Sequence, residues 1–326
     1  MAPTASPGGF LHGSGAMGTD CRSGVVVVGS INMDLVVKTD RIPRPGETVL
    51  GGEFSTIPGG KGANQAVAVA RLGETSTMIG RVGDDLFGRQ LIAGLAEANV
   101  AVDHVSATNG VSSGVALIVV DHKGENAICV APGANQRLMP EDIDANKDVL
   151  ASARVCLMQL EIPIATVLRT IAICRRHGVM TILDVAPARP DLPDEIFQVD
   201  ILSPNASEAE MLTGESTGVH AREAKAVAAA LAAAGARCVV LKLGAAGALA
   251  FDGDRFYHAP GHKVAVVDTT AAGDAFTGAL AVACARGEPL PQAIRYANAA
   301  GALACTRLGA QRSMPGAAEV NNLLGA

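Results

Sequence analysis

The sequence predicts an α/β fold in which a doubly wound, mostly parallel sheet carries helices on both faces and a small antiparallel β lid. Short β-branched runs alternate along the chain with Ala-rich stretches whose apolar residues recur every three or four positions, a pattern typical of helices that cover a parallel sheet. Two further segments show strand-like alternation with no helix between strands. The chain of 326 residues, 49% of them hydrophobic, can bury a large core.

Five apolar runs are the expected strands of the main sheet. They are VVVVGS at 25–30, VCLMQL at 155–160, TILDV at 181–185, DILSP at 200–204 and CVVLKLG at 238–244. The helical stretches ANQAVAVARLG and REAKAVAAALAAAG end at Gly73 and Gly235, and glycine is the usual residue at the left-handed end of a helix. Together these signals predict one α/β domain over residues 24–326.

The lid is expected to form from residues 35–57 and 113–130. Both segments alternate like strands and contain the turn signals PG and KGEN, so they should form antiparallel hairpins that pair into one small sheet. Such a sheet could cover a pocket, and a sheet that keeps an exposed apolar face often pairs with a second subunit. The sequence therefore predicts a homodimer through the lid.

Charge and cysteine content exclude several classes of protein. The formal net charge is -6 with both signs interspersed, so no nucleic-acid surface is expected. Seven scattered cysteines include no C-x-x-C pair, which argues against a disulfide framework or a zinc site and fits a reducing, cytoplasmic location. No apolar run approaches the length of a membrane span. Residues 1–23, rich in Gly, Ser, Pro and Ala, lack the basic start of a signal peptide and are expected to be a flexible tail or an expression remnant.

The glycine-rich stretch PGGKGANQ occupies residues 58–65. It is not a P-loop, because Gly62 stands where that loop needs Ser or Thr and the four-residue spacer is missing. Its glycine turn, Lys61 and Asn64 converge instead on a helix start, where they would hydrogen-bond the hydroxyls of a polyol. The alternative is a turn with a solvated lysine and an asparagine cap.

A second polar group follows the first strand. Asn32 and Asp34 lie two residues apart in SINMDLVV, so in extended backbone their side chains point to the same side. In a doubly wound sheet this position, just past the carboxyl end of a strand, is where ligands bind; the alternative is an ordinary turn. Glu161 ends the apolar run VCLMQLE, where a carboxylate is costly without a partner.

The stretch DTTAAGDAFTGAL at 268–280 contains one acidic residue in a predicted first helical turn, Asp274. Ala271, Ala272 and Gly273 are small enough to let backbone amides converge at the helix start, where an anion is stabilised. With a phosphoryl group on those amides, Asp274 lies within reach of an attacking hydroxyl and could act as a general base. The alternative role is simple complementation of the helix dipole.

Eight stretches, taken in order and spacing, resemble the ribokinase branch of the PfkB carbohydrate kinase family from about Val25 to Ser313. They are GSINMD, GGKGANQA, GENAICVAPGAN, LMQLE, SPNASEAEMLTG, LGAAG, VDTTAAGDAFTGAL and TRLGAQRS. The resemblance implies ATP-dependent phosphorylation of a sugar hydroxyl, with D-ribose converted to ribose 5-phosphate.

The resemblance also implies a role for each matching residue. Asp274 would deprotonate the 5-hydroxyl, and an anion hole would stabilise the γ-phosphoryl group with Ala271, Ala272 and Gly273. The sugar would be bound by Asn32, Met33, Asp34, Gly60, Lys61, Gly62, Ala63, Asn64 and Glu161. Lid strands would supply apolar cover from Ala116, Ile128 and Val130. The nucleotide would be bound by Asn205, Glu208, Lys242, Leu243, Gly244, Ala245, Ala246, Gly247, Gly273 and Asn298.

Two cations are implied as well. Asn205 and Glu208 match the family's N-x-x-E motif, which positions Mg²⁺ and phosphate oxygens. This branch also uses a monovalent cation, for which hard oxygen ligands beside an anion site suit K⁺. Its ligands would come from Asp268, Thr270, Ala304, Arg307, Gly309 and Ser313.

The chain departs from the family pattern at several positions. Asp184 stands where many ribokinases have Asn, and this extra carboxylate could alter the charge of the pocket. Lys242 replaces a common Thr, Ala245 and Ala246 replace the Ser-Arg of some relatives, and Asn298 replaces a His. The side-chain contacts to ATP are therefore expected to differ.

Other readings stay open. Related kinases for deoxyribose, fructose, nucleosides or ketodeoxygluconate share TAAGD, although GGKGANQA, LMQLE and GAQ together favour ribose. A sugar-binding protein without catalysis is disfavoured because it would have no use for Asp274, Asn205 and Glu208. A dehydrogenase is disfavoured because VVVVGSINMD lacks the G-x-G-x-x-G turn.

Overall fold

The computed structural model describes residues 22–215 and 221–325. The tail expected at residues 1–23 therefore lies, except for Arg22 and Ser23, outside the described residues. In the described part of the chain no helix is both long and apolar enough to cross a membrane.

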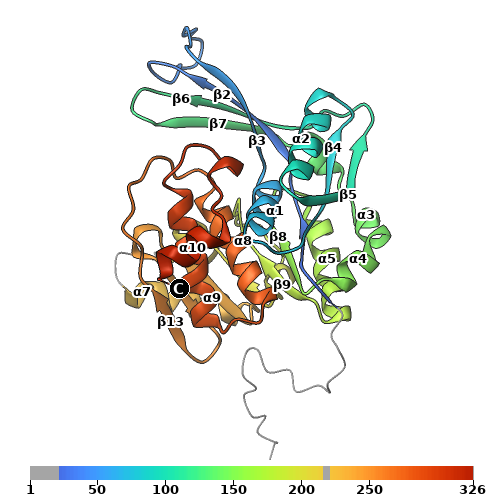
Figure 1. The fold of residues 1–326 in the computed structure, drawn as a ribbon, viewed down its shortest axis with the longest axis vertical. Coiled ribbons are helices and arrows are strands. Elements are labelled where there is room, and N and C mark those ends of the chain that lie inside the picture. The colour runs from blue at the N-terminus through green and yellow to red at the C-terminus, as the bar shows by residue number, and fades with distance from the viewer. Residues whose placement is uncertain (1–21, 216–220, 326) are drawn as a thin grey trace, which may run out of the picture.

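A nine-stranded sheet forms the centre of the molecule (Figure 1). Its strands, in spatial order, are β13 (Phe256–Ala259), β12 (Ala248–Phe251), β11 (Cys238–Lys242), β10 (Ile201–Leu202), β9 (Met180–Leu183), β8 (Val155–Met158), β1 (Val25–Val28), β4 (Ser76–Gly83) and β5 (Val100–Thr108). All neighbours from β11 to β5 pair in parallel, and the pairs β11–β12 and β12–β13 are antiparallel. The predicted mostly parallel sheet is confirmed.

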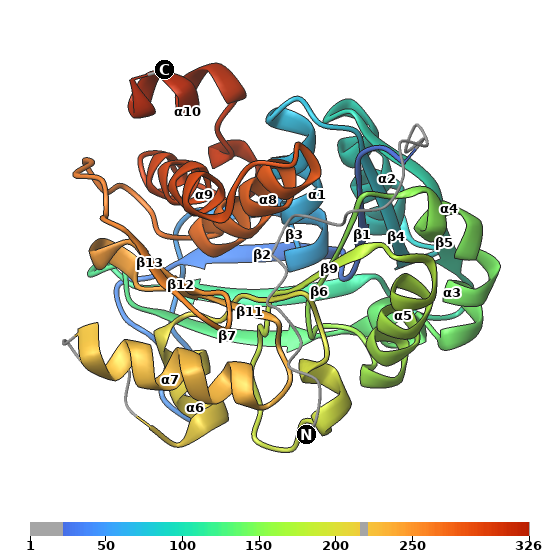
Figure 2. The same cartoon turned by 90° about the horizontal axis from the view of Figure 1, so that it is seen from below.

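Helices cover both faces of this sheet, as Figure 2 shows. One face carries α1 (Lys61–Arg71), α2 (Leu86–Glu97), α8 (Ala272–Ala285), α9 (Leu290–Ala304) and α10 (Ala317–Leu324). The other carries α3 (Pro140–Ala145), α4 (Lys147–Ser152), α5 (Ile164–His177), α6 (Ala206–Thr213) and α7 (Ala221–Ala233). Each face therefore has its own apolar core, and the doubly wound arrangement is confirmed.

The central strand β1 contributes to both cores. Val25 and Val27 pack into the core under α1 and α8, whereas Val26 and Val28 pack into the core under α5. This division follows from the two-residue period of a strand, whose successive side chains point to opposite faces. It explains why the run VVVV is apolar throughout: no position of β1 faces water.

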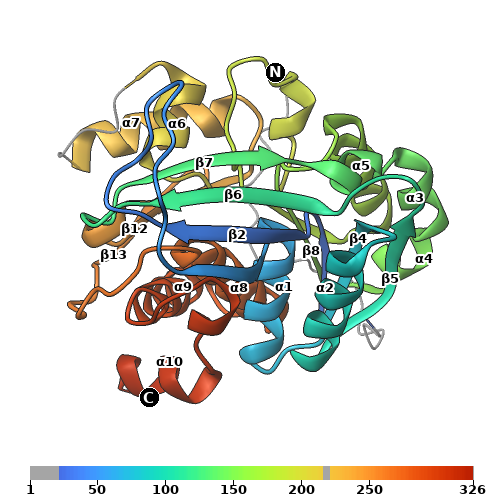
Figure 3. The same cartoon turned by 90° about the horizontal axis from the view of Figure 1, so that it is seen from above.

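A four-stranded lid sheet lies across one end of the molecule, as Figure 3 shows from above. Its strands are β3 (Phe54–Gly59), β2 (Asn32–Lys38), β6 (Gly114–Val120) and β7 (Asn126–Ala131), in that order. The β2–β3 and β6–β7 pairs are antiparallel, as predicted for the two hairpins, but β2 and β6 pair in parallel. Both strands leave the same edge of the main sheet, after β1 and after β5, so they run outward in the same direction.

The chain reverses its direction of travel across the main sheet at β1. From β1 it proceeds to β4 and β5 on one side, and then returns to β8 and continues to β9, β10 and β11 on the other side. In such sheets the crevice outside the carboxyl ends of the strands at the switch point is the usual ligand site. The lid strand β2 begins four residues after β1 ends, so it lies over this crevice.

Candidate active site

The loops after β1, β8 and β9 meet the first turns of α1 and α8 in this crevice. The glycine turn before α1 makes the approach possible. Gly60 has a φ of +88°, and a side chain there would place its Cβ 2.6 Å from the Asn32 nitrogen. Only glycine permits both this backbone conformation and this close contact. The turn thereby brings Lys61 and Asn64 beside β2.

Asp274 is the third residue of α8 and is 6% exposed. Its Oδ2 accepts a hydrogen bond from Asn64 Nδ2 at 2.9 Å, and its Oδ1 accepts one from Gln65 Nε2 at 3.1 Å. Burial raises the pKa of Asp274 to about 6, against the opposing charge of Lys61. A carboxylate with a pKa close to neutrality is suited to accept a proton under physiological conditions.

The start of α8 has the geometry of an anion site. Ala271 has a left-handed conformation with a φ of 58°, which is unusual for a residue with a Cβ, and no side chain caps the helix there. The amides of Gly273 and Asp274 belong to the first turn, which has no intrahelical acceptor for them. A Cβ on Gly273 would meet only Lys242 Nζ, at 3.8 Å. Free amides, a positive helix end and an ammonium group thus converge on one space.

Three carboxylates and one ammonium face each other across the crevice. Glu161 Oε2 accepts hydrogen bonds from Ser30 Oγ at 2.5 Å and from the Lys61 amide at 3.2 Å. Burial, helped by Glu161 and Asp274, raises the pKa of Asp34 to about 7. Burial lowers the pKa of Lys61, but the surrounding carboxylates outweigh it and hold that pKa above its usual range. Lys61 therefore stays charged and balances the acidic groups.

Asn64 has a buried acceptor that no described residue satisfies. Its Nδ2 donates to Asp274, while its Oδ1 has no hydrogen-bond partner in the described part of the chain. A buried polar atom without a partner costs about 1–3 kcal/mol. A ligand hydroxyl that donates to this oxygen would remove that cost and would lie close to Asp274.

The remaining residues predicted for the sugar have different surroundings. Asn32 Oδ1 accepts from Asn135 Nδ2 at 2.7 Å, so Asn135 fixes its orientation. Met33 and Ala63 are buried, and their side chains belong to the apolar core. Gly62 packs against the loop after β1, where a Cβ would lie 2.7 Å from the Ser30 nitrogen.

The lid residues predicted to cover the sugar share one face of the lid sheet. Asp34 pairs in register with Ala116, which pairs with Val130; Ile128 lies two residues before Val130 and therefore points to the same face. Ala116 is buried, whereas the side chains of Ile128 and Val130 are 56% and 47% exposed. The apolar surface beside Asp34 is thus available to a ligand.

The residues predicted to bind nucleotide come from four elements. Asn205 and Glu208 form a reciprocal cap of α6: Asn205 Oδ1 accepts from the Glu208 amide at 2.9 Å, and Glu208 Oε2 accepts from the Asn205 amide at 2.7 Å. Asn298 on α9 donates to the Pro260 carbonyl at 2.7 Å. The loop after β11 leaves three small residues on the surface, namely Gly244, Ala245 and Ala246, between half-buried Leu243 and buried Gly247.

No group of three or more His, Cys, Asp or Glu side chains within residues 22–215 and 221–325 could hold a metal by itself. Mg²⁺ usually keeps several waters and binds through substrate phosphates and one or two carboxylates. Glu208, which interacts electrostatically with Lys242, is a carboxylate of the kind that Mg²⁺ binds, and burial raises its pKa.

The predicted ligands for K⁺ lie in two segments that the structure joins. Asp268 accepts hydrogen bonds from the amides of Thr270 and Gly309, both at 2.9 Å. Although burial opposes it, these hydrogen bonds hold the pKa of Asp268 below its usual range. Ser313 is buried and donates to the Ala310 carbonyl at 2.8 Å. Of the others, Ala304 ends α9 and Arg307 pairs with Glu319.

Sequence reasoning treated Asp184 and Lys242 as two separate departures, but the structure pairs them. Lys242 Nζ lies 2.7 Å from Asp184 Oδ1, and the two side chains are only 10% and 2% exposed. Asp184 Oδ2 also accepts from Gln65 Nε2 at 2.9 Å and from Thr277 Oγ1 at 3.2 Å. The pair lies directly below the anion site and next to the predicted base.

Several polar residues of the site were not predicted from the sequence. They are Ser30, Gln65, Asn135, Gln159 and Thr277. Four of them form hydrogen bonds to predicted residues or to Asp184, and Gln159 bonds to Gln65. Gln65 follows Asn64 directly in GANQ and Gln159 precedes Glu161 in MQLE, so their place in these motifs was an available signal. Asn135 ends GENAICVAPGAN and Thr277 stands in VDTTAAGDAFTGAL, so the same signal was available for both.

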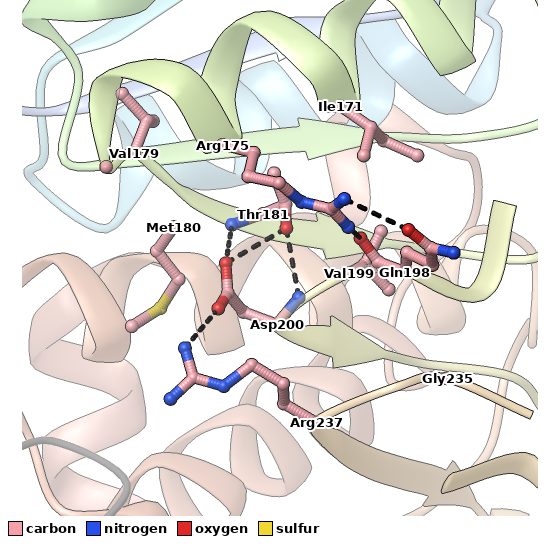
Figure 4. Close-up of a pocket in the computed structure, with 11 residues that line it drawn as sticks. Ile171, Arg175, Val179, Met180, Thr181, Gln198, Val199, Asp200, Gly235 and Arg237 are labelled. Atoms are coloured by element: carbon pink, nitrogen blue, oxygen red, sulfur yellow. Dashed lines mark hydrogen bonds and ion pairs between the residues drawn. The ribbon is translucent and has the colours of Figure 1, made fainter. Parts of the chain in front are cut away.

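A cavity of about 640 Å³ lies elsewhere and contains none of the predicted site residues. Figure 4 shows that its polar groups pair with one another. Asp200 accepts from Thr181 and from Arg237 Nη1, and Arg175 donates to Gln198. These residues lie at the amino ends of β9, β10 and β11, so the cavity is at the sheet edge opposite to Asp274.

Comparison with known proteins assigns the family. Residues 22–317 match the family described as pfkB family carbohydrate kinase. The ribokinase of Bacillus subtilis (strain 168) is 40% identical over 300 residues, which cover 92% of this chain and 99% of that protein. A deoxyribokinase of Salmonella typhi is 35% identical over 301 residues, covering 92% of this chain and 98% of that one.

Comparison with solved structures supports the same family. The structure of Arabidopsis thaliana ribokinase complexed with ribose and ATP matches with a TM-score of 0.88 and 35% identity, over 94% of this chain and 99% of that chain. With the sequence match over nearly the whole domain and the shared fold, the chain belongs to the PfkB family of carbohydrate kinases.

Proposed function

We propose that this carbohydrate kinase transfers the γ-phosphoryl group of ATP to the 5-hydroxyl of D-ribose and releases D-ribose 5-phosphate and ADP. The observation that carries the proposal is the contact between Asn64 and Asp274, which puts an unsatisfied acceptor for a sugar hydroxyl beside a buried carboxylate at an anion site. The relative whose structure contains both ribose and ATP, at 35% identity, supports this choice of substrates.

The sugar would lie between the lid and the first turn of α1. A polyol needs both donors and acceptors, and the crevice offers both kinds. Asp34 and Glu161 accept hydrogen bonds, Lys61 donates them, and the amides of Asn32 and Asn64 can do either. Apolar side chains of the lid would cover the carbon face of the ring and exclude water.

Asp274 would accept the proton of the 5-hydroxyl. The oxygen then attacks the γ-phosphorus, and the bond from that phosphorus to the bridging oxygen of ADP breaks. Charge that develops on the phosphoryl oxygens would be stabilised by the amides of Gly273 and Asp274 at the start of α8, because the Ala272 amide already donates to the Thr269 carbonyl. Phosphoryl transfer depends mainly on positioning and on charge stabilisation, so a base and an amide nest suit this reaction.

The nucleotide would occupy the surface formed by the loop after β11 and by α9 near Asn298. Mg²⁺, when bound with ATP, neutralises charge on the phosphates. On the protein side, Asn205 and Glu208 would hold it through water, because their cap of α6 uses only Oε2 of the Glu208 carboxylate. K⁺ would bind between Asp268, Thr270 and the segment from Ala304 to Ser313, behind the anion site.

Deoxyribose is the second candidate substrate, because a deoxyribokinase is a relative at 35% identity. Asp34 would accept hydrogen bonds from two neighbouring hydroxyls of ribose, and 2-deoxyribose lacks one of them. A site that hydrogen-bonds a substrate hydroxyl discriminates strongly against the analogue without it. Ribose should therefore have the higher kcat/KM.

An ADP-release assay with a panel of acceptors tests the proposal. Ribose, 2-deoxyribose, fructose and a nucleoside are each supplied below saturation with Mg-ATP, and ³¹P and ¹³C NMR identify the phosphorylated carbon. We expect the highest kcat/KM for ribose and a product phosphorylated at O5. A higher kcat/KM for any other acceptor, or phosphorylation at another carbon, contradicts the assignment.

We also propose that the lid mediates a homodimer. On the lid face opposite to Asp34, Phe54 and Leu117 are 64% and 52% exposed. Exposed apolar side chains gathered on one sheet face are typical of an interaction surface. A second copy that packs its own lid on this face would bury them.

A further inference from the structure

We propose that Asp184 and Lys242 form a positioning pair for the base: through Gln65 the pair holds the Asp274 carboxylate in place, and through its charges it sets the pH range in which that carboxylate accepts a proton. The inference deepens the proposed kinase mechanism and rests on Asp274 as the base.

An unbroken chain of contacts links the pair to Asp274. Lys242 Nζ donates to Asp184 Oδ1 at 2.7 Å. Gln65 Nε2 donates to Asp184 Oδ2 at 2.9 Å and to Asp274 Oδ1 at 3.1 Å. One amide group thus bridges the carboxylate of Asp184, in the loop after β9, and that of Asp274, on α8, with one hydrogen for each.

Gln159 fixes the direction of that bridge. Its Nε2 donates to Gln65 Oε1 at 2.6 Å, so the oxygen of the Gln65 amide is already used and its NH₂ group must face the two carboxylates. From α8 itself, Thr277 Oγ1 lies 3.2 Å from Asp184 Oδ2. Asp184 is therefore bound to α1, α8 and β11 together, and any movement of its carboxylate would be passed to Asp274.

The charges around Asp274 come from six elements. They are Asp34 on β2, Lys61 on α1, Glu161 after β8, Asp184 after β9, Glu208 on α6 and Lys242 on β11. Among these groups the carboxylates outnumber the ammonium groups. Asp184 is 1% exposed, and a buried carboxylate without a partner is strongly unfavourable. Lys242 is thus the group that permits a second buried carboxylate next to the base.

The pair has a consequence that a purely structural ion pair would not have. In Asp184→Asn a negative charge next to Asp274 is lost and the Lys242 ammonium stays, so Asp274 should release its proton more easily. The acid limb of the kcat/KM profile should then move to lower pH by about one unit, the size typical for a neighbouring charge. In Asp184→Asn/Lys242→Met both charges are lost, and the limb should return to within about 0.3 unit of the unmodified enzyme.

A direct titration separates this inference from the proposed function. The ¹³C resonance of the Asp274 carboxyl is followed against pH in the protein without substrate, in both variants and in the unmodified chain. Asp200→Asn is the matched control, since Asp200 also pairs with a cation, Arg237, but at the opposite sheet edge. We expect Asp184→Asn to lower the Asp274 midpoint, and the double variant and the control to leave it in place.

The outcomes are distinct. An unchanged Asp274 midpoint in Asp184→Asn, or an equal shift in the double variant, overturns the pairing role even when ribose is phosphorylated normally. If Asp184→Asn does not fold, the test uses the double variant, which leaves no unpaired buried charge. A shift of about one unit in its Asp274 midpoint would contradict the inference that the charges of Asp184 and Lys242 balance at Asp274. Failure of the unmodified enzyme to phosphorylate ribose contradicts the proposed function and leaves the titration result standing.

Gln65→Leu tests whether Gln65 holds the Asp274 carboxylate in place. This variant keeps the side-chain size but removes both hydrogen bonds to the carboxylates. We expect kcat to fall about tenfold, equivalent to about 1.4 kcal/mol in the transition state, with the KM for ribose changed less than about twofold. If kcat/KM falls only because the KM for ribose rises, while kcat stays unchanged, Gln65 serves sugar binding instead.

Discussion

Asn64 Nδ2 donates a hydrogen bond to Asp274 Oδ2 at 2.9 Å, although the two residues are 210 positions apart in the sequence. This bond joins the first turn of α1 to the first turn of α8. It couples the group proposed to hold a sugar hydroxyl with the group proposed to deprotonate it.

Replacement of Asp274 by Asn should remove the base with little change in shape. We expect turnover to fall by on the order of a hundred- to ten-thousand-fold, because the 5-hydroxyl then loses its proton acceptor. Ribose affinity, measured by calorimetry with the inactive variant, should stay within about threefold because, under the proposed mechanism, Asp274 would contact the sugar only at the reacting oxygen. Retained turnover would disprove the base assignment.

The pH dependence of kcat/KM should show an acid limb near pH 6. Burial raises the pKa of Asp274 to about 6, and only the deprotonated carboxylate can act as a base, so activity should rise as pH increases through that value. Steady-state rates measured between roughly pH 4.5 and 8, in buffers of constant ionic strength, give the pH midpoint of this limb. A limb close to pH 4, the value of an unperturbed Asp, would show that Asp274 is not buried as described.

Asp34 should make the ligand-free protein less stable as pH rises. Its folded pKa is raised to about 7, above the value of an unfolded Asp, so its favourable contribution is complete below about pH 4 and is lost as pH rises to about 7. Asp34→Asn should therefore raise the melting temperature at pH 8 by a few degrees, with little change at pH 4.5, and should weaken ribose binding. A variant that melts lower at pH 8 than the parent would contradict this account.

The lid interface can be tested by the oligomeric state. Leu117→Asp puts a carboxylate on the exposed face opposite to Asp34, where burial against a second copy would desolvate it. We expect light scattering to report a dimer for the parent and a monomer for the variant at about 10 μM, since a buried unpaired charge costs several kcal/mol. Phe256→Asp, outside the lid, is the control that should keep the mass of the parent. A monomeric parent would contradict the proposal.

Potassium dependence tests the loop that contains Asp268. With K⁺ replacing Na⁺ at constant ionic strength, we expect kcat/KM to rise by about tenfold, equivalent to about 1.4 kcal/mol of charge stabilisation. Asp268→Ala removes the acceptor that joins Thr270 and Gly309, and should abolish the difference between the two ions. Equal rates in K⁺ and Na⁺ for the parent would rule out the cation role.

Most of the fold could be predicted because its signals are local. The run VVVV at 25–28 is buried on both faces and therefore apolar throughout, and the glycine ends of α1 and α7 depend on a few neighbouring residues. The parallel pairing of β2 with β6 could not be predicted in this way. It depends on where two hairpins leave the main sheet, which local alternation does not encode.

The candidate site also combines residues that local motifs reveal with contacts that only the fold creates. Asp34, Lys61, Asn64 and Asp274 stand in short motifs whose chemistry can be recognised in the sequence. The pairing of Asp184 with Lys242 spans 58 positions and that of Asn32 with Asn135 spans 103. Contacts of this kind arise only when β9, β11 and the lid are placed around the crevice, so each residue alone looked like an isolated departure or an ordinary turn.

The position of α8 at the far end of the chain has a consequence for synthesis. The residues proposed to bind ribose all precede Ile162, and the base and its amide nest come more than a hundred residues later. Because domains are made from the N-terminus onward, a ribosome-bound chain that already exposes β1, the lid and α1 has no means of activating a hydroxyl or water. If Asp274 is the base, an incomplete chain would be unable to cleave ATP prematurely, since the proposed chemistry would begin only when the last third of the chain packs against the first.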